Sequence, residues 1–213
     1  MTASDYPPPG TTSRGRHLAV AAVAVITVMG TVGTALSPYL LVRQPLLLIA
    51  LSPDVRNIVL VAAQADFLPV LAVAEPRRAM GLFAMYAMGF FYGPLAIAWF
   101  EQRSARAGRV LRWLERLFAR LGAPLLVVFP AYTVGALAGV ARTRLRVFVP
   151  AMLVGQVVYI GVSYFLGDAA REWTTPLVRF LGEHLVESTA VCVAAVVIHQ
   201  VWSRWGRTGP KDG

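Results

Sequence analysis

The chain has 213 residues, of which 57% are hydrophobic, and its formal net charge is +9. Several apolar runs approach the roughly 20 residues that a membrane-spanning helix needs, which argues against a soluble helical domain. The single cysteine, Cys192, excludes a disulfide framework and a cysteine-based metal site. We therefore expect an integral membrane protein.

Residues 1–17 are rich in Pro, Gly, Ser and Thr, which predicts a disordered tail, placed on the cytoplasmic side. An apolar run from Leu18 to Leu36 follows Arg14 and Arg16. Such a run also resembles a secretory signal peptide, although it is longer than most signal cores. We favour an uncleaved first helix and leave cleavage as the alternative.

Six apolar stretches follow one another along the chain, at residues 18–42, 57–74, 79–100, 121–141, 147–167 and 184–203. Between the third and the fourth, residues 105–120 place apolar side chains on one helical face and arginines on the other. This pattern predicts a basic amphipathic helix on the membrane surface, with a solvated connector as the alternative. Residues 206–213 form a second predicted cytoplasmic tail.

Two of the apolar segments contain residues that break helices. Prolines and glycines interrupt residues 121–141, and three prolines interrupt residues 45–74. Either segment can therefore enter the membrane and return to the same side, as a re-entrant hairpin, or cross it as a kinked span.

The distribution of basic residues favours two re-entrant hairpins, since cytoplasmic loops are enriched in Lys and Arg. With six crossings and a cytoplasmic N-terminus, the twenty basic residues divide ten to ten. With residues 45–74 and 121–141 both re-entrant, fourteen lie inside and six outside. The sequence thus predicts an all-α membrane domain over residues 18–205, with about four full transmembrane helices, two re-entrant hairpins and both termini cytoplasmic.

The same segments resemble the DedA family of bacterial membrane proteins, also called the VTT or SNARE-associated family. The resemblance rests on the order of five pieces over about residues 35–170. They are a broken segment, "PLLLIALSPDVRNIVLVAAQADFLPVLAV", the helix "MYAMGFFYGPLAIAWFEQR", the surface helix "RVLRWLERLFARLG", the segment "FPAYTVGALAGVAR", and the span "FVPAMLVGQVVYIGVSYFLG". The resemblance implies two hairpins that face each other and a location in the bacterial inner membrane.

The resemblance also implies that the protein moves phospholipids or a polyprenyl phosphate carrier between leaflets, in some members with the proton-motive force. The chain is a divergent member, because charged residues typical of the family are replaced. Val128 and Thr133 stand where arginines are usual, and Val70 and Leu71 follow Pro69 where an acidic residue is usual. We therefore keep a non-transporting membrane scaffold as the alternative function.

Asp66 lies within the first broken segment, far along the chain from other charges. An acid within a membrane generally faces a cavity or a basic partner, which makes Asp66 a candidate for proton or substrate handling. The alternative is that Asp66 caps the helix that follows it. Together with the polar side chains Gln64, Tyr132 and Thr133, it forms the predicted substrate and proton pathway.

Four arginines are the predicted ligands of a lipid phosphate, because a guanidinium group binds phosphate with two parallel hydrogen bonds. Arg142 and Arg144 would act on the inner side, and Arg77 and Arg78, which belong to "EPRR", on the outer side. The alternative is that these arginines only anchor the ends of helices. We expect the partners to be membrane lipids that are anionic or carry a phosphate, and we expect no nucleic acid. A homo-oligomer remains an open alternative.

The sequence contains no signature of a hydrolase, a metalloprotease or a nucleotide-binding loop. Glu183, His184 and Glu187 lie within one turn or so of one another, but a metal site needs more convergent ligands. We therefore expect no enzyme activity, no cofactor and no metal.

Overall fold

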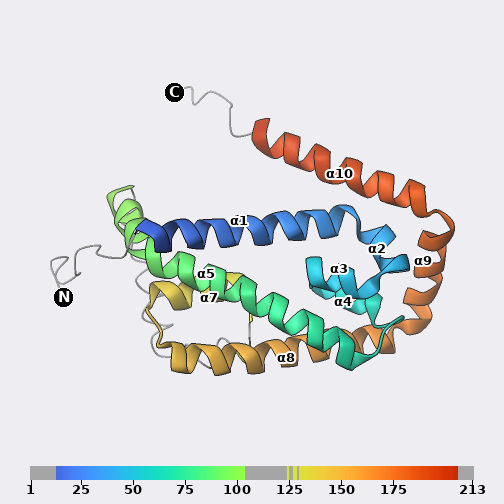
Figure 1. Cartoon of the computed structure of the whole chain (residues 1–213), viewed down its shortest axis with the longest axis horizontal. Helices are drawn as coiled ribbons and strands as arrows, with labels where there is room; N and C mark the ends of the chain where they lie inside the picture. Colours follow the sequence, from blue (N-terminus) through green and yellow to red (C-terminus); the bar gives the residue numbers. More distant parts are fainter. Residues whose placement is uncertain (1–12, 104–123, 125–126, 129, 206–213) are drawn as a thin grey trace. The chain divides into compact units, whose positions relative to one another are not determined.

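A computed structural model describes residues 13–103, 124, 127–128 and 130–205, and this part of the chain contains helices and no strand (Figure 1). The predicted all-α class is therefore confirmed. The helices are α1 (Ser13–Ala35), α2 (Ser37–Arg43), α3 (Pro45–Leu51), α4 (Val55–Val61), α5 (Phe67–Arg103), α7 (Tyr132–Val140), α8 (Leu145–Ala169), α9 (Arg171–Glu183) and α10 (Leu185–Trp205).

Three of these helices are long and apolar enough to cross a membrane, which supports the predicted membrane protein. The qualifying segments are Arg14–Ala35, Leu145–Ala169 and Leu185–Trp202. They match the predicted stretches 18–42, 147–167 and 184–203. The first ends earlier than predicted, because α1 stops at Ala35 and α2 begins as a separate helix with Pro38 in its first turn. At its other end α1 begins at Ser13, inside the predicted tail.

The described helices pack as two compact units. Unit 1 contains the described residues of 1–26 and 78–159, and unit 2 those of 27–77 and 160–213. Helices α1, α5 and α8 contribute residues to both units.

In unit 2, three short helices pack against one another: α2, α3 and α4 (Figure 1). Each has seven residues and is thus roughly 10 Å long, a third of the thickness of a hydrocarbon core. Prolines start two of them, since Pro38 and Pro45 lie in the first turns of α2 and α3. A proline costs little there, because the first N–H groups of a helix have no intrahelical partner.

The chain turns between α3 and α4 at Ser52, Pro53 and Asp54. The Ser52 hydroxyl donates to the Asp54 carboxylate at 2.8 Å, and the Asn57 amide nitrogen donates to the Ser52 carbonyl at 2.8 Å. Ser52 and Asn57 are buried, so these hydrogen bonds replace the water that the polar groups of the turn would otherwise bind.

In unit 1, the core forms between α5, α7 and α8. Leu82, Ala138, Phe148 and Met152 are buried together there, and aromatic rings extend the cluster. The ring of Tyr86 packs on that of Phe148 at 4.6 Å between centroids. Helix α8 contributes one face to this core through Phe148 and Met152.

Helix α5 corrects one prediction. It continues without interruption from Phe67 to Arg103, so Glu75–Arg78, which separate two of the predicted apolar stretches, belong to one helix. The predicted first re-entrant segment, 45–74, thus divides into the short helices α3 and α4 and the start of α5. The predicted span 79–100 lies within the same continuous helix. The proline that marked the return limb, Pro69, lies in the first turn of α5, where it breaks no hydrogen bond.

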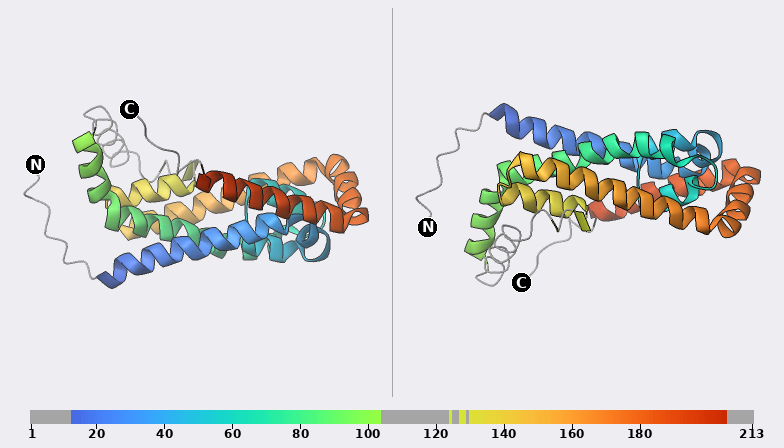
Figure 2. Two further views of the ribbon diagram at one scale, coloured as in Figure 1. Left: turned by 90° about the horizontal axis from the view of Figure 1, so that it is seen from above. Right: turned by 90° about the horizontal axis from the view of Figure 1, so that it is seen from below.

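The residues between the predicted spans 147–167 and 184–203 form a helix, α9, which lies between the ends of α8 and α10 (Figure 2). Helix α2 packs against both α9 and α10. The predicted surface helix 105–120, the tail residues 1–12 and 206–213, and most of residues 121–129 lie outside the described residues.

Candidate functional site

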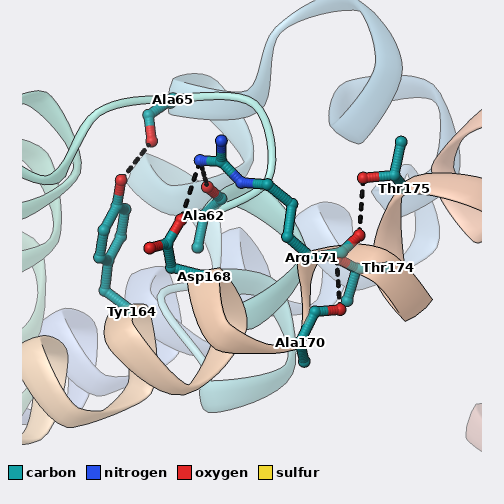
Figure 3. Close-up of polar contacts among 8 residues, drawn as sticks. All are labelled: Ala62, Ala65, Tyr164, Asp168, Ala170, Arg171, Thr174 and Thr175. Carbon is teal, nitrogen blue, oxygen red and sulfur yellow. Dashed lines mark hydrogen bonds and ion pairs between the residues drawn. The ribbon is translucent and has the colours of Figure 1, made fainter.

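The loop between α4 and α5 carries two of the predicted pathway residues and is held by side chains from α8 and α9 (Figure 3). The Tyr164 hydroxyl donates to the Ala65 carbonyl at 2.9 Å, and the Arg171 guanidinium donates to the Ala62 carbonyl at 3.0 Å. Arg171 also pairs with Asp168 at 3.0 Å. These bonds satisfy one carbonyl at the C-terminal end of α4, that of Ala62, and one in the loop that follows, that of Ala65.

Gln64 lies in this loop and contacts α2. Its side-chain nitrogen donates to the carbonyl of Leu41 at 3.0 Å, within the last turn of α2. The amide thus binds a backbone group at a helix end, while the residue as a whole stays exposed. Its predicted part in a substrate pathway stays a prediction.

Asp66 directly precedes α5 and is exposed. Its carbonyl accepts a hydrogen bond from the N–H of Val70 at 3.4 Å, which is the backbone pattern of a residue at the start of a helix. The position agrees with the capping alternative, and the exposed carboxylate is also accessible to a proton or a substrate. Both roles predicted for Asp66 are compatible with this placement.

Arg77 and Arg78 are consecutive and buried, although Arg is among the residues least often buried in proteins. Arg77 belongs to unit 2, where its guanidinium donates to the carbonyl of Leu51 at 3.2 Å. Leu51 ends α3, immediately before the turn at Pro53. Arg77 therefore binds the backbone at the break between α3 and α4.

Arg78 belongs to unit 1, where its guanidinium donates to the carbonyl of Pro130 at 3.1 Å. Pro130 lies just before Ala131, which has an extended backbone and precedes α7. The same guanidinium lies over the Tyr159 ring at 3.9 Å and near the Tyr132 ring at 5.8 Å, measured to the ring centroids. Arg78 thus binds the second broken segment just before α7 by a hydrogen bond, and it makes cation–π contact with Tyr159 of α8.

The remaining predicted residues lie in unit 1 around α7. Tyr132 and Thr133 form its first turn, where Tyr132 is half-buried and Thr133 is exposed. Arg142 follows the helix with φ of 49° and packs over the Phe90 ring at 5.2 Å. Arg144 is exposed and precedes α8.

The predicted phosphate ligands therefore occupy two kinds of environment. Arg142 and Arg144 are exposed, whereas Arg77 and Arg78 are buried against backbone carbonyls. The predicted pathway residues also divide, because Gln64 and Asp66 belong to unit 2 and Tyr132 and Thr133 to unit 1. The binding of a lipid phosphate or a proton by these residues stays a prediction.

Sequence reasoning missed several polar residues of α8 and its surroundings. Tyr164, Asp168 and Arg171 hold the loop of Asp66, and Gln156 is completely buried in α8. Gln156 was detectable as the only amide side chain in the apolar stretch 147–167. The contact of Arg171 with the loop could not be predicted, because an arginine that follows a span is usually interpreted as an anchor at the membrane surface.

Among the described residues, no group of three or more His, Cys, Asp or Glu side chains could hold a metal ion. No family model matches the chain, and neither a curated protein nor a solved structure matches it.

Proposed function

We propose that this protein is a membrane transporter or scramblase that moves a phosphate-bearing lipid, either a polyprenyl phosphate carrier or a phospholipid, between leaflets. The observation that carries the proposal is the pairing of short, proline-interrupted helices with buried arginines. Charged side chains within membranes are costly and generally mark the path of an ion or a polar substrate. Discontinuous helices are the usual site of substrate binding in secondary transporters.

The resemblance to the DedA family supports the same proposal, as it combines re-entrant hairpins with lipid translocation. In this proposal α3 and α4 form the first hairpin, and the segment that ends in α7 forms the second. Helix α5 provides the fourth span, both termini lie in the cytoplasm, and the membrane is the bacterial inner membrane. Neither hairpin helix of unit 2 is long enough to cross a bilayer alone.

Within this proposal the exposed arginines and the exposed acid have different roles. Arg142 and Arg144 would hold the lipid phosphate at the inner surface, because both are exposed beyond the end of α7. Asp66 would take up or release a proton beside Gln64. Arg77 and Arg78 would add positive potential near the hairpins while they bind the carbonyls of Leu51 and Pro130.

The alternative function is a membrane scaffold that retains the fold without transport. One observation favours it: both buried arginines bind backbone carbonyls, so a structural role explains their burial. The two functions differ in whether the protein accelerates lipid exchange.

The experiment that tests the proposal is leaflet exchange of labelled lipids in proteoliposomes, with polyprenyl phosphate compared with phosphatidylethanolamine. We expect exchange above that of empty vesicles. It should fall about ten-fold or more in Asp66→Asn and in the double variant Arg142→Ala/Arg144→Ala, because removal of a charged partner costs about 1.5–3 kcal/mol. Arg77 and Arg78 stay intact, since their replacement would also remove the bonds to Leu51 and Pro130.

Matched controls remove an exposed charge elsewhere. Arg146→Ala removes an exposed guanidinium group two residues beyond Arg144. Glu172→Gln removes an exposed carboxylate of α9. Both should exchange lipid like the wild type. If the folded protein exchanges neither lipid, the scaffold replaces the transporter. If the site variants behave like the controls, the transporter stands and the assigned residues are wrong.

A further inference from the structure

Helix α9 connects two of the helices that qualify as membrane spans. A single residue, Ala170, separates it from the end of α8, and a single residue, His184, separates it from the start of α10. It runs crosswise to both helices where they meet it (Figure 1). One residue spans less than 4 Å, so α9 must lie at the depth where the two spans end. That depth is the boundary between lipid tails and water.

The side of α9 that faces the protein is small. Thr174 is buried, and Val178 and Leu181 are half-buried on the same side of the helix. This side packs against α2, where a methyl group added to Gly182 would meet Val42 at 3.7 Å. The rest of the circumference of α9 is exposed.

A second side of α9 is apolar and exposed. Trp173, Leu177 and Phe180 follow one another at helical spacing and are 83%, 47% and 55% exposed. Large apolar side chains that gather on one exposed face mark a contact with another apolar phase or partner. Tryptophan in particular is enriched at the membrane–water boundary, where its ring meets lipid and its N–H meets water.

The third side of α9 is polar and balanced in charge. A groove of about 570 Å³ runs along it and is bordered by Phe180 of the apolar side. Its other lining residues are Thr175, Pro176 and the charged residues Arg171, Arg179, Glu172 and Glu183. The two arginines and the two glutamates cancel, so this side gives no net attraction to an anionic surface. Apolar contact is therefore the dominant force that can fix α9 to a membrane.

From these three sides we infer that α9 is an interfacial helix, embedded lengthwise in the bilayer surface with Trp173, Leu177 and Phe180 among the lipid tails. Its partner is the lipid itself and not another protein. The buried apolar area holds the helix in place, and the balanced charges let it remain there in zwitterionic and in anionic membranes alike. This inference does not depend on the proposed transport of lipid.

The test places nitroxide labels on two sides of α9 in the full-length protein. With Cys192 replaced by alanine, Leu177→Cys labels the apolar side and Glu172→Cys the polar side. The proteins are reconstituted into phosphatidylcholine vesicles. Collisions of each nitroxide are measured with oxygen, which concentrates in lipid, and with a neutral nickel chelate, which stays in water.

We expect the label at position 177 to collide mainly with oxygen and the label at position 172 mainly with the nickel chelate. Phe180→Cys repeats the measurement on the apolar side, in case Leu177→Cys does not fold. Nickel collisions at both sides would place α9 in water and overturn the inference. Protection of position 177 from both reagents would overturn it as well, because a protein partner or a second copy would then cover this side.

A second arm tests the balance of charge. When phosphatidylglycerol replaces part of the phosphatidylcholine, or when salt is raised, the ratio of oxygen to nickel collisions at position 177 should not change. A ratio that rises with anionic lipid and falls with salt would show that charge holds the helix, and would contradict the assignment to apolar contact.

Discussion

At the scale of single residues, Gln156 shows a buried polar group that the fold does not satisfy. Its side chain is completely buried in α8, and neither of its amide atoms has a hydrogen-bond partner in the described part of the chain. Burial of an amide without such a partner costs free energy, because the hydrogen bonds to water are lost and not replaced. The turn residue Asn57 differs, as its amide nitrogen donates to Ser52.

Replacement of Gln156 by methionine should therefore stabilise the protein. Methionine has a similar length and leaves no buried amide, so we expect the free energy of unfolding to rise by about 1–3 kcal/mol. Thermal unfolding in one detergent would measure it. Asn57→Leu is the comparison and should destabilise the protein, since it removes a hydrogen bond that closes the turn before α4. A loss of stability in Gln156→Met would show that the buried amide has a partner that stabilises the fold.

At the scale of single residues, the sequence predicts which residues belong to the candidate site but not which contacts they make. Asp66 and the arginines attract attention in the sequence because charges are rare in apolar segments. Their burial and their partners cannot be predicted in the same way. Arg78 binds a carbonyl 52 positions away, and Tyr164 binds one 99 positions away. Such contacts depend on how distant helices pack, which a local pattern does not contain.

At the scale of elements, α5 and α7 approach each other through glycines. A methyl group added to Gly89 would clash with the backbone carbonyl of Ala136, and one added to Gly139 would clash with the backbone of Tyr86 and Phe90. Small residues let two helix backbones come into contact, which is a common way to pack helices in membranes. The spacing of glycines in the motifs that resemble the DedA family thus has a direct explanation in packing.

Alanine at either glycine should separate these two helices. We expect Gly89→Ala and Gly139→Ala each to lower the free energy of unfolding by about 1–3 kcal/mol, as overpacked cores do. Gly161→Ala in α8 is the matched control. A methyl group there meets no atom within 4 Å, so this change should be neutral or stabilising by up to about 1 kcal/mol. If all three changes had the same effect on the free energy of unfolding, helix propensity and not backbone contact would determine that effect.

The elements that sequence reasoning recovered are those with a long uniform signal. α1, α8 and α10 follow from apolar runs of sufficient length, and the break between α3 and α4 follows from Pro53. α5 was not predicted as one helix, because the charged residues within Glu75–Arg78 separate two apolar stretches in the sequence. The two arginines can be buried within this helix because their guanidinium groups donate hydrogen bonds to carbonyl groups elsewhere in the chain. α9 was missed because Pro176 interrupts its sequence, although Trp173, Leu177 and Phe180 follow helical spacing.

At the scale of the whole molecule, the two units share one arrangement. Each contains a proline-interrupted segment, and in each an arginine of α5 donates to a carbonyl beside the interruption. Successive side chains leave a helix about 100° apart, so two neighbouring arginines of one helix can serve two different segments. A repeated arrangement of this kind agrees with the proposal of two hairpins, one entering from each side of the membrane.

The side on which each connection lies can be tested with cysteine labelling in intact cells. In the Cys192→Ala protein, Glu172→Cys should react with an impermeant maleimide, because α9 lies outside in the proposed topology and Glu172 is exposed. Thr174, only 8% exposed, would be a poor reporter on the same helix. Ser104→Cys should react only after the membrane is permeabilised, since the basic segment that follows α5 is expected inside.

Reaction of both cysteines in intact cells would mean that both broken segments cross the membrane, and the hairpins would have to be abandoned. Protection of Glu172→Cys in intact cells would place α9 on the cytoplasmic side and contradict the proposed topology, because the single-residue connections to α8 and α10 fix α9 at the side where both spans end.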